Sequence, residues 1–332
     1  MKTKTCLPWL RAFCAFALLG LSGVVATPAT AQESSWPSRP ITLVVPFPPG
    51  GGTDVLARML TSNLEKALNQ TFVVDNKPGA SGNIGAALVS RSEPNGQTFL
   101  LQATIIGVYP HVYKDIGYDP VTGLDPITTI AETPNIVVVR PDSPLQSFGD
   151  LLNKAKDAKA PLTFATAGTG SPQHMAMEVV ADRAGAHMQH VPYKGTSPAI
   201  VDVIGGQVDA GVFSLSSTLP FVRSGKLKVL AVLSPERFPL IPDAPSIREL
   251  GFDGIDSAVR FLILSPPRTP APIVKRMNEV IHNAVRSPEF EKMLEEAGYR
   301  GVLSTPEEAR AMIRNEYDTW GPVVKRLGLN PS

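Results

Sequence analysis

Residues 41–64 read ITLVVPFPPGGGTDVLARMLTSNL and contain the pattern that decides the fold. The apolar run Ile41–Pro46 predicts a buried strand, and Val55–Leu68 carries apolar residues at helical spacing. Between them, the segment 46–54 (PFPPGGGTD) turns the strand into the helix. Three consecutive glycines let a ligand approach the backbone amides, and the helix start adds unpaired N–H groups. The stretch predicts an α/β unit with an anion site; a plain tight turn is the alternative.

The alternation of strands and helices continues along the chain. Further strands are expected at 71–75, 98–103, 135–140, 162–166, 189–191, 210–213, 227–233 and 261–264. Further helices are expected at 82–90, 147–158, 172–184, 198–204, 272–286, 288–296 and 306–327. The first β-α-β-α-β run implies a parallel sheet with helices on both faces. A second set and a return strand predict two lobes around a cleft, with residues 32–103 and 221–332 in lobe 1 and residues 104–220 in lobe 2.

The chain has 32 prolines among 332 residues, and five of them mark predicted helix starts. Proline suits the first helical position, because that amide is unpaired in any case. These prolines are Pro172, Pro198, Pro272, Pro288 and Pro306. The residues before them, which we expect to be N-caps, are Ser171, Ser197, Ala271, Ser287 and Thr305. Thr305 and Glu308 also fit a capping box.

The N-terminus has the three parts of a secretory signal peptide. A basic start precedes an uncharged apolar run over Ala12–Val25 and the small-residue pattern Ala29-Thr30-Ala31. A membrane anchor is the alternative, but the run is shorter than the ~20 residues of a spanning helix. Both cysteines, Cys6 and Cys14, lie in this segment. We expect an exported chain that begins near Gln32 and contains no thiol.

Composition excludes several classes of function. The formal net charge is +1. Residues 1–31 hold three Lys or Arg and no Asp or Glu, so 28 of the 31 basic residues remain against 30 acidic ones, a net of −2. A protein that neutralises many phosphates would be basic, so we expect no nucleic-acid partner. Without cysteine, the exported chain has neither disulfides nor Cys-bound metal.

A second glycine-rich turn, 166–174 (TAGTGSPQH), also joins a predicted strand to a predicted helix. Gly168 and Gly170 expose backbone amides there, and Ser171 is the expected N-cap. His174, in the first helical turn, either points at the cleft or packs against its own loop.

Other reactive side chains give weaker patterns. Ser171 and His174 could belong to a hydrolase triad, but no G-x-S-x-G turn is present and their spacing does not give nucleophile–base geometry. His187 and His190 stand at a helix–strand junction without a carboxylate motif, so we expect no metal site. Tyr193-Lys194-Gly195 either faces the cleft or forms a solvated turn. Tyr317 and Trp320 are expected to pack in the core or between the lobes.

Several segments together resemble a known family. They are 37–54 (PSRPITLVVPFPPGGGTD), 73–86 (VVDNKPGASGNIGA), 113–120 (YKDIGYDP), 167–179 (AGTGSPQHMAMEV), 190–211 (HVPYKGTSPAIVDVIGGQVDAG) and 224–232 (SGKLKVLAV). They resemble the Bug-type extracytoplasmic solute-binding receptors of tripartite tricarboxylate transporters, from about Trp36 to Leu329. The resemblance implies a two-lobed periplasmic-binding-protein (Venus flytrap) fold, a periplasmic location and a membrane permease as partner. It also implies that amides of Phe47–Asp54 and Gly168–His174 hold a ligand carboxylate, and that the 81–83 turn lies near the first loop.

The chain departs from the family pattern where specificity should lie. Gln102–Ile106 replaces a run that is often small and polar, Arg260 stands where an aromatic residue is common, and Phe213 stands where an acidic one is frequent. These changes disfavour citrate-like ligands. We expect a monoanion or dianion with an apolar or aromatic body, whose second acidic group pairs with Arg260 if that side chain faces the cleft. The expected ligand-binding residues are Phe47, Pro49, Gly50, Gly51, Asp54, Thr104, Ala167, Gly168, Gly170, Ser171, His174 and Arg260.

The expected function is therefore that of a solute receptor rather than an enzyme. A ligand that touches both lobes only in the closed form would shift the population towards that form. We expect a monomer with no cofactor and no metal. A receptor for a signalling partner is an alternative, and a secreted hydrolase is a second alternative, disfavoured by the missing nucleophile turn.

Overall fold

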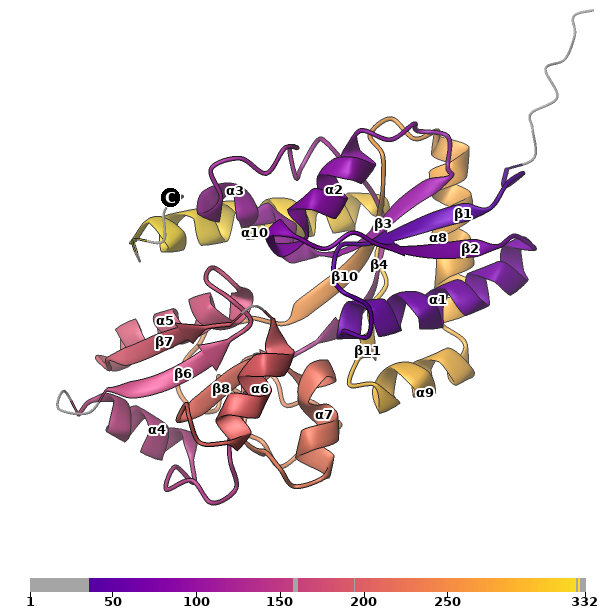
Figure 1. Ribbon diagram of the computed structural model, residues 1–332. Coiled ribbons are helices and arrows are strands. Elements are labelled where there is room, and N and C mark those ends of the chain that lie inside the picture. Colours follow the sequence, from indigo (N-terminus) through magenta and orange to yellow (C-terminus); the bar gives the residue numbers. More distant parts are fainter. Residues whose placement is uncertain (1–35, 158–160, 194, 327, 329–332) are drawn as a thin grey trace, which may run out of the picture. The chain divides into compact units, whose positions relative to one another are not determined.

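Two β-sheets organise the chain in the computed structural model, which describes residues 36–157, 161–193, 195–326 and 328 (Figure 1). The predicted signal peptide and Lys194 lie outside the described residues. The fold is the mixed α/β, two-sheet arrangement that the sequence predicts, with helices flanking each sheet. No helix in the described ranges is long and apolar enough to cross a membrane.

The first sheet has six strands in the order β11-β4-β10-β3-β1-β2. Their bounds are β1 (Ile41–Val45), β2 (Phe72–Asn76), β3 (Thr98–Ala103), β4 (Asp125–Thr133), β10 (Val259–Ser265) and β11 (Arg300–Gly301). Strand β1 pairs in parallel with β2 and β3, whereas β10 runs antiparallel to β3 and β4. Since β1, β2 and β3 are parallel, the loop after β1 and the end of β3 lie at one edge of the sheet.

The second sheet has five strands in the order β7-β6-β8-β5-β9. Their bounds are β5 (Asn135–Val139), β6 (Leu162–Thr166), β7 (Met188–Pro192), β8 (Ala210–Ser214) and β9 (Lys228–Val232). Strand β6 pairs in parallel with both β7 and β8. The segments that follow β6 and β8 therefore leave from the same edge of this sheet.

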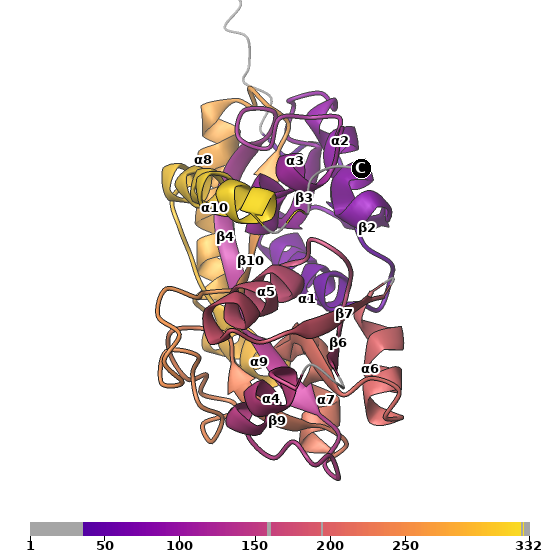
Figure 2. The same cartoon turned by 90° about the vertical axis from the view of Figure 1, so that its left-hand side faces the viewer.

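Helices cover both faces of the second sheet. The helices and short 3-10 turns of the described residues are α1 (Gly52–Leu68), η1 (Ala80–Gly82), α2 (Asn83–Ser90), η2 (Thr104–Gly107), α3 (Tyr109–Val112), α4 (Phe148–Ala155), α5 (Pro172–Ala184), α6 (Thr196–Ile204), α7 (Leu215–Arg223), α8 (Ala271–Val285), α9 (Pro288–Glu296) and α10 (Pro306–Arg326). Val137 and Val139 of β5 pack in one buried cluster with α4 and α5, whereas Ile136 and Val138 pack in another with α6 and α7 (Figure 2). Successive side chains of a strand point to opposite faces, so β5 separates the two clusters.

The chain passes between the sheets twice, after β4 and after β9. The strands change sheet at points other than the predicted lobe boundaries. Residues 125–133, expected in lobe 2 and not recognised as a strand, form β4 of the first sheet. Residues 228–232, expected in lobe 1, form β9 of the second sheet by pairing with β5. Pairing with a distant strand decides each membership, and the local pattern does not encode it.

Helix starts follow the expected chemistry at three of the five prolines. Ser171 and Ser287 cap α5 and α9 by accepting hydrogen bonds from the amides three residues ahead. Thr305 and Glu308 form the predicted capping box at α10, with N···O distances of 2.8 and 3.1 Å.

The other two starts differ from the prediction. Helix α6 begins at Thr196, two residues earlier than expected, because Gly195, with φ +105°, turns the chain and takes the cap position instead of Ser197. Helix α8 already includes Ala271, and Pro270 holds the cap position.

Candidate functional site

The loop after β1 is shaped by the buried carboxylate of Asp54. Its Oδ2 accepts hydrogen bonds from the Gly50 amide at 2.9 Å and from Arg58 Nε at 3.0 Å. Its Oδ1 accepts one from Asn76 Nδ2 at 3.0 Å, and the same Asn76 group donates to the Phe47 carbonyl. Burial acts to raise the pKa of Asp54, but the hydrogen bonds from Arg58, Gly50 and Asn76 outweigh it and lower the pKa.

Two predicted ligand-binding groups are thus occupied inside the loop. The Asp54 carboxylate and the Gly50 amide bind each other rather than facing a ligand. Gly50 has φ +81°, so this turn requires glycine. Phe47 is half-buried, whereas Pro49 and Gly51 are exposed on the loop.

The start of α1 presents unpaired backbone amides. Among the described residues, the amides of Gly51 to Asp54 have no hydrogen-bond partner, and no side chain caps the helix. Such a group of N–H donors at the positive end of a helix favours an anion. Asp54 lies in the same turn, but its charge is directed to Arg58 and Asn76.

Gly52 is required for a reason that the sequence did not reveal. Its φ is not positive; instead, an ideal Cβ placed on it would lie 2.7 Å from the Tyr299 hydroxyl and 3.5 Å from Ser216 Oγ. Any side chain at this position would collide with buried Tyr299. The first loop therefore meets two segments from far along the chain.

The loop after β6 is fastened by hydroxyl groups. Thr166 Oγ1 lies 3.1 Å from the Gly168 carbonyl and 3.2 Å from the Gly168 amide, and Ser171 Oγ accepts from the His174 amide at 3.3 Å. The loop bends at Gly168 (φ +151°) and Gly170 (φ +72°). The predicted capping role of Ser171 is confirmed, and it occupies the Ser171 hydroxyl.

His174 packs against its own loop, which is one of the two alternatives that the sequence left open. It is buried, and its Nδ1 accepts a hydrogen bond from the Gly170 amide at 3.1 Å. Its ring stacks on His190 at a centroid distance of 3.7 Å, and His190 Nε2 lies 2.7 Å from Thr166 Oγ1. Burial, followed by the proximity of His174, lowers the pKa of His190 to about 4. The amides of Ala167 and Thr169 keep no partner in the described part of the chain.

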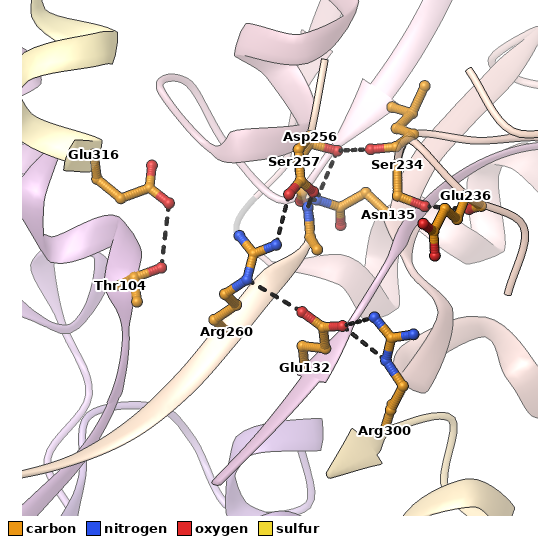
Figure 3. Close-up of polar contacts among 12 residues, drawn as sticks. Thr104, Glu132, Asn135, Ser234, Glu236, Asp256, Ser257, Arg260, Arg300 and Glu316 are labelled. Carbon is orange, nitrogen blue, oxygen red and sulfur yellow. Dashed lines mark hydrogen bonds and ion pairs between the residues drawn. The ribbon is translucent and has the colours of Figure 1, made fainter. Parts of the chain in front are cut away.

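Arg260, expected to pair with an acidic group of the ligand if it faces the cleft, is paired with the chain's own carboxylates. Its Nη2 lies 2.5 Å from Asp256 Oδ2 and its Nε 3.1 Å from Glu132 Oε2 (Figure 3). Glu132 is bound in turn by Arg300. Burial acts to lower the pKa of Arg260, but Asp256 and Glu132 outweigh it and raise the pKa. A second acidic group of a ligand would have to compete with both carboxylates.

Thr104 lines a small cavity of about 10 Å³, room for about one water molecule. Its hydroxyl lies 3.3 Å from Glu316 Oε1 (Figure 3), and Pro172, Asp256 and Trp320 are among the other residues that line the cavity. Burial raises the pKa of Glu316. Thr104 and Arg260 therefore lie beside the carboxyl groups of Asp256 and Glu316, which we call the acidic wall.

Besides Arg260, two departures from the family pattern are buried. Phe213 is completely buried in the second sheet. Gln102 is also completely buried; its Oε1 accepts from the Ala103 amide at 2.8 Å, and its Nε2 has no partner among the described residues. Gly82, in the turn expected near the first loop, contacts Pro46: an ideal Cβ on Gly82 would lie 3.2 Å from the Pro46 side chain.

Sequence reasoning missed the serine-rich start of α7. Ser214 and Ser217 hydroxyls lie 2.8 Å apart, and Ser216 lies against Gly52. These serines leave the same sheet edge as the 166–174 loop, because β6 and β8 are parallel neighbours. The run Ser-Leu-Ser-Ser directly after a predicted strand was the available signal.

The other reactive side chains singled out in the sequence include His187, His190, Tyr193 and Trp320. Within the described ranges, no three His, Cys, Asp or Glu residues gather as metal ligands do. The Tyr193 hydroxyl donates to Asp202 Oδ2 in helix α6 at 2.5 Å. Trp320 packs beside both sheets' buried clusters, as the packing prediction requires.

Comparison with known proteins settles the family. The model of the tripartite tricarboxylate transporter family receptor matches residues 56–329. The chain belongs to this family. It is similar to the solved periplasmic binding protein BugD (31% identity, TM-score 0.81), over 90% of this chain and 100% of that one. The family's receptors bind solutes outside the cytoplasm and are not enzymes.

Two further solved relatives have structures with an organic acid. An R. palustris protein solved with adipate is 33% identical, with a TM-score of 0.83, over 90% of this chain and 100% of that one. MatC from Rhodopseudomonas palustris, solved with bound malate, is 27% identical, with a TM-score of 0.78, over 87% of this chain and 99% of that one. Both acids have two carboxyl groups.

Proposed function

We propose that this receptor captures a small organic carboxylate between the loop edges of its two sheets and delivers it to a tripartite-type membrane permease. The observation that carries the proposal is the start of α1, where Gly51 to Asp54 present unpartnered amides on a loop that Asp54 holds rigid. A preorganised group of amides binds a carboxylate without first losing other hydrogen bonds. The free amides of Ala167 and Thr169 are the second contact point.

The acidic wall supports a ligand with one or two carboxylates rather than three. Asp256 and Glu316 line the cavity beside Thr104, and Arg260 is already neutralised. A third carboxylate placed there would face like charges, which disfavours citrate-like acids. The relatives that hold adipate and malate are consistent with a dianion. We infer that the ligand is an acid with an apolar or aromatic body and that Arg260 does not contact it directly.

The mechanism that we propose is closure of two lobes around the acid. The lobe of the first sheet contains α1 and β4, and the lobe of the second contains the 166–174 loop, α7 and β9. A ligand that binds amides of both lobes stabilises the form in which they approach. The permease would then bind the closed form of a monomeric receptor in the periplasm, after removal of residues 1–31.

Calorimetric titration tests this proposal. The exported chain is titrated with adipate, malate, citrate and benzoate, and native mass spectrometry records any acid that copurifies. We expect at least one monoacid or diacid to bind and citrate to bind more weakly. Tight citrate binding without binding of any other acid would contradict the ligand class, and binding of none of these acids would contradict the function.

A further inference from the structure

Tyr299 carries a buried hydroxyl group without a hydrogen-bond partner. The residue directly precedes β11 and is 1% exposed, and its amide donates to the Leu294 carbonyl at 2.8 Å. Its ring packs edge-on against Phe261 at a centroid distance of 5.8 Å. These contacts hold the ring in one place, yet its hydroxyl makes no hydrogen bond of acceptable geometry within the described residues, although the Ser216 hydroxyl is its polar neighbour. A buried polar group that stays unpaired destabilises the folded state, so its retention requires a reason.

The hydroxyl is directed at the start of α1. The close approach to Gly52 places it beside the helical turn whose amides are free, and Ser216 of α7 borders the same point. Gly52 has no side chain to separate the phenol from this turn. The hydroxyl thus lies where the first loop meets the start of α7, at the edges of both sheets.

Tyr299 stays protonated at any physiological pH. Burial raises its pKa to about 12, and the neighbouring Ser216 hydroxyl acts in the opposite direction. A neutral phenol in this position donates one hydrogen bond. Together with backbone N–H groups, it forms a set of donors that is complementary to a carboxylate oxygen.

We propose that Tyr299 is a ligand-binding residue whose hydroxyl donates a hydrogen bond to a carboxylate oxygen seated at the start of α1. This inference rests on the proposed function and adds to it a side-chain donor that selects acids able to reach between Gly52 and Ser216. It explains two observations together: the orphaned hydroxyl and the absence of a side chain at position 52.

The test is the Tyr299→Phe variant, which removes one oxygen and keeps the ring packing. Its affinity for the acid that the wild type binds is measured by calorimetry, and its melting temperature is measured without ligand. We expect the affinity to fall about 10- to 100-fold, the range for a hydrogen bond to a charged group. The ligand-free melting temperature should stay the same or rise, because an unpaired hydroxyl is removed. Tyr109→Phe, at a second buried phenol in α3, is the matched control and should leave the affinity unchanged.

The outcomes separate this inference from the function on which it rests. Unchanged affinity in Tyr299→Phe, with an acid bound by the wild type, would overturn the inference and leave the receptor function intact. A loss of affinity accompanied by a lower ligand-free melting temperature would assign Tyr299 a structural role and also overturn it. If the wild type binds no acid of the panel, both the function and the inference fail.

Discussion

Replacing Asp54 by Asn should remove hydrogen bonds that fix the loop after β1. The variant keeps the size of the side chain but replaces one acceptor oxygen by a donor that faces donors: the Gly50 amide, Arg58 and Asn76. The Arg58 side chain is 56% exposed, so its ion pair contributes only about 0.3–0.5 kcal/mol. The loss of one charge-assisted bond between the Gly50 amide and the buried Asp54 carboxylate contributes about 1.5–3 kcal/mol. The free energy of unfolding should therefore fall by about 2–3.5 kcal/mol.

Calorimetric unfolding measures this loss. At about 2–4 °C per kcal/mol, the melting temperature at pH 7 should fall by roughly 4–14 °C. The folded-state pKa of Asp54 lies below its ordinary value of 3.8, so its stabilisation is present above that pH and is lost as the pH falls through the lower folded-state value. The difference between wild type and variant should therefore shrink in strong acid.

Asp142→Asn is the control for the Asp54 prediction. It removes an exposed carboxylate that lies 3.5 Å from Arg140, and should change the melting temperature by little. Acid affinity should fall in Asp54→Asn and remain unchanged in Asp142→Asn. An Asp54→Asn protein that melts with the wild type and binds acid equally well would refute the proposed role of Asp54.

Three further variants test other parts of the site. Arg260→Met should lower the free energy of unfolding by about 1–3 kcal/mol through the loss of its bond to Glu132, with less than a threefold change in acid affinity; a hundredfold loss of affinity would mean that Arg260 binds the ligand. The pKa of His190 is about 4 in the folded wild type and has its usual value of 6.5 in the unfolded chain. The unfolded chain therefore takes up a proton first as the pH falls, and the free energy of unfolding decreases between these two values. His190→Gln should flatten this decrease in melting scans, and an unaltered pH profile would contradict the prediction. Gly52→Ala should cost about 1–3 kcal/mol by collision with Tyr299, and chemical denaturation should show part of this regained in Gly52→Ala/Tyr299→Phe; no loss in the single variant would contradict the close contact.

Periodicity and turn chemistry predicted the local structure well. The strand–glycine–helix pattern of residues 41–64 gave β1 and α1, and Ser or Thr before Pro gave the caps of α5, α9 and α10. These features depend on neighbouring residues, so they can be read from the sequence alone. The family resemblance supplied the two-sheet fold, and the family match confirms it.

What the sequence did not reveal depends on distant partners. Strand β4 contains buried threonines whose polar atoms bond segments far along the chain; Thr133 Oγ1 donates to the Gly298 carbonyl at 2.8 Å. Without those partners the run did not resemble a buried strand. We expected Arg260 to bind an acidic group of the ligand, because its neighbours in the sequence give no sign that Glu132 lies beside it in the fold. Tyr299 was missed for the same reason, since its relation to Gly52 exists only in the fold.

The measurement that tests the central claim most directly is an NMR titration of ¹⁵N-glycine-labelled receptor with the acid that calorimetry identifies. The amide signals of Gly51 and Gly52 should shift on saturation, because their free N–H groups acquire an acceptor. Gly185 and Gly225, which already bond their own helix ends, should not shift. Unmoved Gly51 and Gly52 signals in a protein saturated with acid would contradict the claim that the start of α1 holds the carboxylate.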